Sequence, residues 1–220
     1  MQTMPLTSHY IDIEGVNIHY VSAEPCANEN TNTVATLVFL HGFPEYWQAW
    51  QHQLSYFSNN YRVIAPDLPG YNLSDKPDDV NFYQVPHLIA FISKFIAAVS
   101  QNQKVFLVAH DWGGAIAWPL AAFYPQYIDK LVILNAAHPS TFTREMINNP
   151  LQRSKSDYIH QLIDLNAIDL LQQHNYQYLC EKMTFSDGSS VLNDNTKTLY
   201  INAWQQTGVI NGMLQYYRAM

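Results

Sequence analysis

The sequence has few charged residues, only 13% of 220, and basic residues are the scarcer kind. Eleven Lys and Arg stand against eighteen Asp and Glu, which leaves a formal charge of -7. A nucleic-acid partner requires a basic surface for its phosphates, so we expect no nucleic-acid binding. Apolar residues make up 48%, which excludes an intrinsically disordered chain. A chain of this length buries about 70% of its unfolded surface, and its core needs neither a disulfide nor a metal.

Cysteine is scarce as well. Cys26 and Cys180 are far apart and outside any CxxC pair, which is typical of reduced thiols in a cytoplasmic protein. The first ten residues lack the basic and apolar regions of a signal peptide. No run reaches the roughly 18 apolar residues of a membrane span, and the best candidate, residues 88–99, contains Lys94. The sequence therefore predicts a soluble, cytoplasmic protein.

Short apolar runs alternate with helical segments in residues 1–138. This order predicts an α/β fold with a mostly parallel sheet wrapped by helices. Residues 139–220 hold no comparable strand, only helical patches rich in Leu, Gln, Asn and Tyr. We expect a core at 1–138 and a helical module at 139–220. The expected elements are a hairpin at 9–22, a polar loop at 24–33, buried strands at 35–40, 61–65, 105–109 and 131–134, and helices at 47–57, 85–99 and 112–124.

The third buried strand runs into a helix through a pattern typical of a nucleophile elbow. Small residues, Ala109, Gly113 and Gly114, flank Asp111 at the positions where so sharp a turn crowds the backbone. A carboxylate that attacks a saturated carbon bearing a leaving group forms an alkyl ester, a stable covalent intermediate. The adjacent helix N-terminus favours the ionised carboxylate. Taken alone, Asp111 would be read as a helix N-cap; the three small residues favour the nucleophile.

The first buried strand ends in His41-Gly42-Phe43-Pro44. In elbow enzymes the oxyanion is stabilised by the backbone N–H after the nucleophile and by another N–H from this earlier loop. The sequence therefore predicts that Phe43 and Trp112 supply the two donors. By itself, the segment could equally be an ordinary turn at a strand end.

Several motifs together resemble the α/β-hydrolase fold, and specifically the epoxide hydrolase family. They are His-Gly-Phe-Pro-Glu-Tyr-Trp at 41–47, Ala-Pro-Asp-Leu-Pro-Gly-Tyr at 65–71, Ser-Asp-Lys-Pro at 74–77, His-Asp-Trp-Gly-Gly at 110–114 and Leu-Asn-Ala-Ala-His-Pro at 134–139. The resemblance covers the chain from about residue 9. It implies Asp111 as nucleophile, a cis bond before Pro44, structural roles for His41 and His110, and no cofactor or metal.

The resemblance also implies that residues 139–220 form a cap over the active site. Two cap tyrosines in this family donate a proton to the epoxide oxygen, and Tyr158 and Tyr217 stand at similar positions. A phenol is a suitable acid for the far more basic alkoxide. The alternative for each tyrosine is packing between cap and core. The aromatic-rich cap suggests a small apolar epoxide as substrate.

The hydrolytic half of the reaction needs a His base and an acid that orients it, which elbow enzymes place after the nucleophile. In this family both normally follow the cap, and about 70 further residues would hold them. Some dehalogenase relatives place the acid after the fourth strand, where this chain has Asn135 and Ala136. We therefore expect a truncated chain that forms the alkyl-enzyme ester without turnover. The strand at 131–134 would then be an open apolar edge that favours self-association.

Two other functions compete with epoxide hydrolysis. A haloalkane dehalogenase uses the same Asp and elbow Trp, but its second halide donor is often Asn where this chain has Phe43. The two tyrosines also favour epoxides. The third possibility is a truncated, non-catalytic or partner-binding protein.

Overall fold

A computed structural model describes residues 5–25, 34–185 and 187–220. Its central sheet has the order β1-β2-β4-β3-β5-β6. The strands are β1 (Thr7–Ile13), β2 (Val16–Ala23), β3 (Thr36–Leu40), β4 (Arg62–Pro66), β5 (Val105–His110) and β6 (Ile128–Leu134). β1 and β2 pair antiparallel with each other, and β2 pairs antiparallel with β4. β4, β3, β5 and β6 run parallel, which confirms the mostly parallel sheet.

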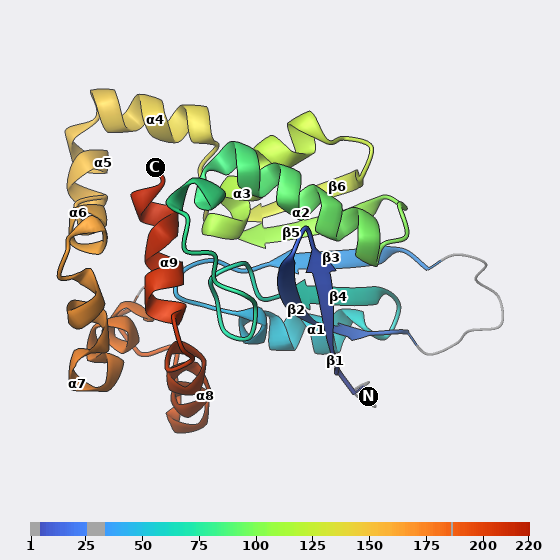
Figure 1. Cartoon of the computed structure of the whole chain (residues 1–220), viewed down its shortest axis with the longest axis horizontal. Coiled ribbons are helices and arrows are strands. Elements are labelled where there is room, and N and C mark those ends of the chain that lie inside the picture. Colours follow the sequence, from blue (N-terminus) through green and yellow to red (C-terminus); the bar gives the residue numbers. More distant parts are fainter. Residues whose placement is uncertain (1–4, 26–33, 186) are drawn as a thin grey trace.

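Helices cover both faces of this sheet (Figure 1). On one face lie α2 (Val85–Val99) and α3 (Trp112–Phe123), and the other face is covered by α1 (Gln51–Phe57), which follows the 3-10 turn η1 (Trp47–Trp50). A second 3-10 turn, η2 (Val80–Tyr83), precedes α2. The long apolar stripe of α2 buries eight of its residues. The helix predicted at 85–99 is confirmed with the same bounds.

The remaining helices gather beyond the carboxyl ends of the parallel strands (Figure 1). They are α4 (Pro139–Asn148), α5 (Pro150–Lys155), α6 (Tyr158–Ile163), α7 (Ala167–Lys182), α8 (Asp194–Trp204) and α9 (Val209–Arg218). The Trp204 indole donates to the Pro44 carbonyl at 2.7 Å. Backbone of α9 also approaches the loop after β4 so closely that a Cβ on Gly212 would lie 2.6 Å from the Gly70 carbonyl oxygen. These contacts join the helices to the sheet.

Two strand predictions need correction. All five residues of β3 are buried, as its apolar run predicts, but β5 alternates buried and half-buried residues. β6 begins three residues earlier than predicted, and its Val132 and Leu134 are 46% and 43% exposed. The reason is that β6 ends the sheet in the described part of the chain, where α3 covers only one of its faces.

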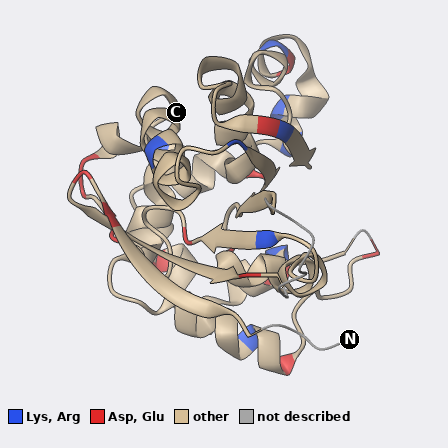
Figure 2. Cartoon of the chain, turned by 90° about the vertical axis from the view of Figure 1, so that its right-hand side faces the viewer, with Lys and Arg blue, Asp and Glu red and all other residues tan. Residues whose placement is uncertain are grey.

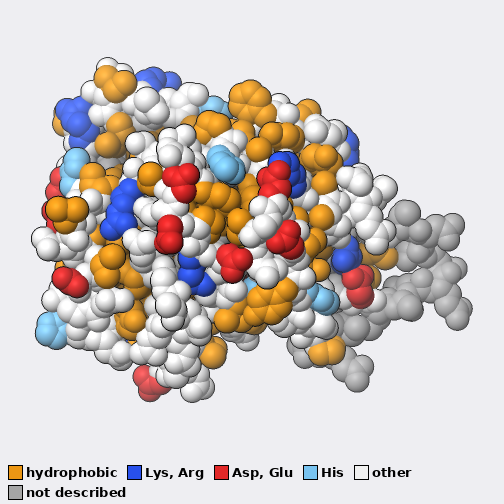
Figure 3. Space-filling view, in the orientation of Figure 1, with side chains coloured by type: hydrophobic (Ala, Val, Ile, Leu, Met, Phe, Trp, Pro, Cys, Tyr) orange, Lys and Arg blue, Asp and Glu red, His pale blue; other side chains and the backbone are white. Residues whose placement is uncertain are grey.

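Some smaller expectations also change. The hairpin starts at Thr7, and its turn consists of Glu14 and Gly15 alone. Cys26 and most of the predicted polar loop lie outside the described residues, whereas Cys180 is a free thiol. Acidic and basic residues are scattered along the ribbon, and hydrophobic side chains are spread among acidic ones on the surface (Figures 2 and 3).

Candidate active site

Asp111 lies at the sharp turn between β5 and α3, with a backbone φ of 50° and ψ of -119°. A positive φ is strained for a residue with a side chain and is characteristic of functional turns. The N–H of Gly113 donates to the His41 carbonyl at 3.0 Å. A Cβ on Gly113 would lie 2.5 Å from the Leu40 carbonyl oxygen, so only glycine allows this approach. The sequence pattern is therefore explained by the geometry of the turn.

The other small residues of the pattern are equally confined. Ala109 is fully buried under the turn. A Cβ on Gly114 would collide with the Ala136 side chain and lie 3.3 Å from Cγ2 of Ile133, which places α3 directly on β6. A Cβ on Gly42 would collide with Cβ and Oδ1 of Asp111. The loop after β3 thus lies against the Asp111 carboxylate.

Two backbone N–H groups act on this carboxylate. The N–H of Phe43 donates to Oδ1 of Asp111 at 2.8 Å, and the N–H of Trp112 also lowers the pKa of the carboxyl. These are the two predicted oxyanion donors, and the structure brings both to Asp111. The Phe43–Pro44 bond is cis, as the resemblance implied. Desolvation raises the pKa of Asp111, and the two N–H groups oppose this without cancelling it.

Tyr217 of α9 and Tyr158 of α6 lie together over this site. Their ring centroids are 6.4 Å apart, and the Tyr217 ring lies edge-on to Trp112 at 5.3 Å and to Phe43 at 5.2 Å. Tyr217 is 4% exposed, whereas Tyr158 is 41% exposed. Burial and the nearby charge of Asp111 raise the pKa of both phenols, that of Tyr217 well above its ordinary value. Both hydroxyls are therefore held protonated next to the carboxylate.

The neighbouring Tyr216 points elsewhere. Its hydroxyl donates to the Pro69 carbonyl at 2.8 Å, and the side chain is fully buried. Successive helical residues point in different directions, so only one of the two adjacent tyrosines reaches the site.

A histidine–glutamate pair beside Asp111 escaped sequence reasoning. Nδ1 of His110 lies 3.0 Å from Oε2 of Glu45, and this hydrogen bond raises the pKa of His110. The only sequence signal was that both residues adjoin predicted site positions. His41 is different, because its Nδ1 donates to the Gly42 carbonyl and its Nε2 accepts from the N–H of Leu68. Burial lowers the pKa of His41 and keeps it neutral.

All nine histidines lie in the described ranges, and none of them hydrogen-bonds to Asp111. Within those ranges no cluster of three His, Cys, Asp or Glu side chains could hold a metal ion. Nor does any helix found there have the length and apolarity to cross a membrane.

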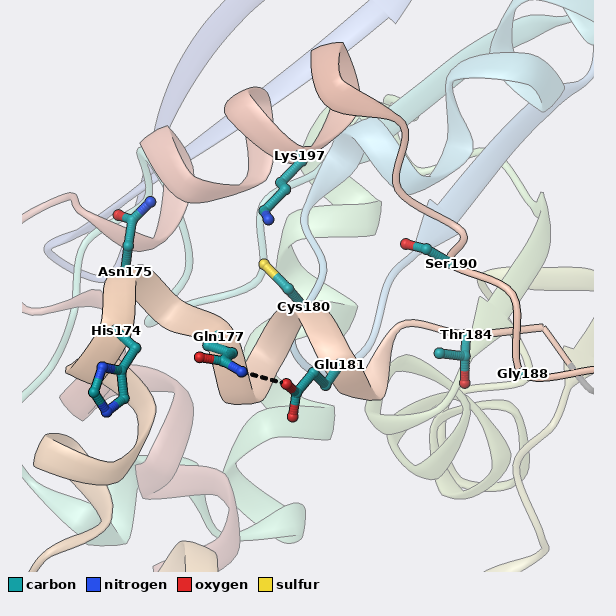
Figure 4. Close-up of a pocket in the computed structure, with 9 residues that line it drawn as sticks. All are labelled: His174, Asn175, Gln177, Cys180, Glu181, Thr184, Gly188, Ser190 and Lys197. Carbon is teal, nitrogen blue, oxygen red and sulfur yellow. Dashed lines mark hydrogen bonds between the residues drawn. The ribbon is translucent and has the colours of Figure 1, made fainter.

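A groove of about 560 Å³ lies elsewhere, beside α7 and α8 (Figure 4). Cys180 points toward Lys197 across it, and burial raises the pKa of the thiol. No predicted site residue lines this groove, so it is separate from the Asp111 site. Its lining residues are His174, Asn175, Gln177, Cys180, Glu181, Thr184, Gly188, Ser190 and Lys197.

Comparison with known proteins agrees with this geometry. The family model for the alpha/beta hydrolase fold matches residues 35–219. The AB hydrolase superfamily protein YfhM of Bacillus subtilis is 34% identical over 218 residues, which are 96% of this chain and 72% of that protein. Epoxide hydrolase 4 of Mus musculus is 33% identical, and the match covers 96% of this chain but 59% of the relative.

Among solved structures, the Bacillus megaterium epoxide hydrolase in complex with an inhibitor superimposes with a TM-score of 0.84 at 35% identity. The match covers 96% of this chain and 71% of that one. Several curated epoxide hydrolases are matched over less than two thirds of their own length. The chain belongs to the α/β-hydrolase family, in the group of the epoxide hydrolases.

Proposed function

We propose that this chain opens epoxides by nucleophilic attack of Asp111. The observation that carries the proposal is the approach of two protonated tyrosines, Tyr158 and Tyr217, to the elbow carboxylate. The opening of a strained ring needs a nucleophile and a nearby acid. Relatives and structural neighbours named epoxide hydrolases support the same reaction.

The first step balances with these groups alone. One carboxylate oxygen of Asp111 forms a bond to an epoxide carbon while the bond between that carbon and the ring oxygen breaks. The ring oxygen takes a proton from Tyr217, and the Tyr158 ring lies beside the Tyr217 ring. The products are a hydroxyalkyl ester of Asp111 and a tyrosinate, which recovers its proton from water. Tyr217 is the better placed donor because it is the more buried and touches both oxyanion-loop and elbow side chains.

Hydrolysis of that ester needs a base that activates water, and the N–H groups of Phe43 and Trp112 would then stabilise the oxyanion. No described histidine bonds to Asp111. We therefore propose that these residues carry the alkylation step, and that a His–acid pair which this chain does not supply releases the diol.

The walls of the site indicate the substrate class. Phe43, Trp112 and Tyr217 present aromatic surfaces around the carboxylate, which suits a small apolar epoxide. A haloalkane is less suited, because the second halide donor is often Asn at the position where this chain has Phe43. We also propose that residues 139–220 act as the cap over a core at 1–138. A cytoplasmic location stays a prediction.

Intact mass spectrometry after incubation with styrene oxide tests the proposal. One adduct per chain, mapped to Asp111 and absent from Asp111→Asn, is the expected result. Multiple turnovers of diol would contradict the restriction to alkylation. Halide release from 1-chlorohexane at a faster rate would favour the dehalogenase reaction. Absence of any adduct on Asp111 would favour a non-catalytic protein.

A further inference from the structure

A second hydrogen-bonded chain of nucleophile, imidazole and carboxylate begins at the β1 edge of the sheet, on strands other than the one that carries Asp111. Oγ of Ser8 on β1 is 2.8 Å from Nε2 of His19 on β2. Nδ1 of the same ring is 2.7 Å from Oδ2 of Asp67, just after β4. In the sheet order, β1 is separated from β5 and its elbow by β2, β4 and β3. The proposed epoxide chemistry uses none of these three residues.

The surroundings of Asp67 determine the His19 tautomer. The carboxylate is fully buried and accepts hydrogen bonds from the Trp47 N–H at 3.1 Å and the Asn72 amide at 2.9 Å. A carboxylate with such donors is an acceptor, so Nδ1 of His19 must carry the proton it shares with Asp67. In the neutral imidazole Nε2 then has a free lone pair, which accepts the proton of the Ser8 hydroxyl. These are the roles of a Ser-His-Asp triad, which is recognised by geometry rather than by sequence order.

The nucleophile of this triad is open to solvent, whereas its partners are not. Ser8 is exposed, and His19 is only 2% exposed. The Tyr10 ring, 57% exposed, stands 5.1 Å from the His19 ring on the same face of the sheet. An arriving acyl group therefore meets a hydroxyl backed by a fixed base and flanked by an aromatic surface.

The hairpin register also supplies an N–H donor. Glu14 and Gly15 both have positive φ, 54° and 82°, as in the two-residue type I′ turn that is closed by a hydrogen-bonded pair, here Ile13 and Val16. Hydrogen-bonded and non-hydrogen-bonded pairs alternate along an antiparallel ladder. Counting from that pair, Ser8 and Val21 form a non-hydrogen-bonded pair.

The N–H of Ser8 therefore faces the open edge of β1. By the same alternation Tyr10 and His19 form a non-hydrogen-bonded pair, so the backbone N–H and C=O of His19 point away from β1. In agreement, the His19 N–H donates to Oγ of Ser74, and its carbonyl accepts from the Asp67 N–H. The nucleophile's own N–H is one of the oxyanion donors in chymotrypsin-type serine proteases.

We propose that Ser8 is a second nucleophile of this protein, activated by His19 and Asp67, and that it takes small activated carboxylic esters. Oγ of Ser8 bonds to the ester carbonyl carbon as its proton passes to Nε2 of His19. The bond to the leaving oxygen breaks, and His19 returns the proton to that oxygen. Water then repeats the sequence on the acyl-Ser8 ester, releasing the acid and restoring the hydroxyl.

The chain contains a matched control for this site. Oγ of Ser22 lies 2.9 Å from Nε2 of His9, in the same hairpin. No carboxylate bonds to His9 among the described residues, and Ser22 is buried at 6% exposure. Ser22 also lines a groove of about 330 Å³ together with His9, so it has the imidazole and an opening to solvent but no described acid on that imidazole.

The test uses the Asp111→Asn chain, so that the elbow carboxylate contributes nothing. Diisopropyl fluorophosphate is added, adducts are mapped by peptide mass spectrometry, and p-nitrophenol release from p-nitrophenyl acetate is followed in parallel. We expect the adduct on Ser8 and not on Ser22. Ser8→Ala should lower p-nitrophenol release about 100-fold, since positioned acid–base catalysis contributes on that order. Ser22→Ala should leave it unchanged.

His19→Gln tests the base, and circular dichroism shows whether this variant folds. If His19→Gln unfolds, Ser8→Ala still tests the proposal, because Ser8 is exposed. Labelling at other serines, or release that is equal in Ser8→Ala and Ser22→Ala, would overturn the proposal. Epoxide alkylation of Asp111 in the Ser8→Ala chain reports separately on the elbow site, so the two proposals fail independently.

Discussion

Removal of the Tyr217 hydroxyl is the sharpest test of the ring-opening step. Tyr217→Phe keeps the ring that packs against Trp112 and Phe43, and removes only the proposed proton donor. General acid catalysis by a positioned side chain contributes about 10²- to 10⁴-fold. We expect the rate of Asp111 alkylation by styrene oxide to fall by that factor. The fall corresponds to about 3–5 kcal/mol in the activation free energy.

Tyr216→Phe is the matched control, because it makes the same change one residue earlier. Its hydroxyl donates to the Pro69 carbonyl inside the core, so its loss should cost about 1 kcal/mol of unfolding free energy. The alkylation rate should stay at the wild-type value. Tyr158→Phe, at a more exposed position, should slow alkylation less than Tyr217→Phe.

The assay is the time course of the intact-mass adduct at several epoxide concentrations, with thermal unfolding measured on each variant. Equal alkylation rates for Tyr217→Phe and Tyr216→Phe would refute the assignment of the acid. A slow rate in both, together with a lowered melting temperature, would show that packing rather than proton donation is being measured.

Three further predictions follow from the same structure. Burial destabilises the ionised Asp111 carboxylate relative to its state in water and so raises its pKa. Asp111→Asn should therefore raise the melting temperature at pH 7 and abolish the adduct. In the unmodified chain, alkylation should decline as pH falls through that raised pKa, and a rate that does not fall on acidification would contradict this. Gly42→Ala places a methyl group where it collides with the Asp111 side chain. We expect the free energy of unfolding in urea to fall by about 1–3 kcal/mol and the adduct to be lost. An unchanged urea midpoint would contradict the close contact between Gly42 and Asp111. In the described chain β6 pairs with another strand on one side only, so copies of the chain should associate through its open edge. Light scattering should detect this association, and Leu134→Lys should weaken it. A monomer at all concentrations would refute the prediction.

The sequence alone was sufficient where a feature depends on neighbours along the chain. The elbow follows from Ala109, Gly113 and Gly114 around one residue, since the backbone crowding they relieve is local. The helix at 85–99 follows from its apolar spacing and is observed with those bounds. The parallel strands follow from short apolar runs that alternate with helices.

Only the tertiary structure decided what depends on distant segments. The half-covered faces of β5 and β6, the Glu45–His110 pair and the Ser8–His19–Asp67 triad are set by strand order and register. Tyr217 reaches Asp111 because α9 returns to the sheet, and the raised pKa of the carboxyl reflects burial by segments about 70 to 100 residues away. Apolar periodicity specifies which face of an element is buried, but not which element covers it. The sequence therefore singled out Asp111 as the proposed nucleophile, and the packing decided its surroundings.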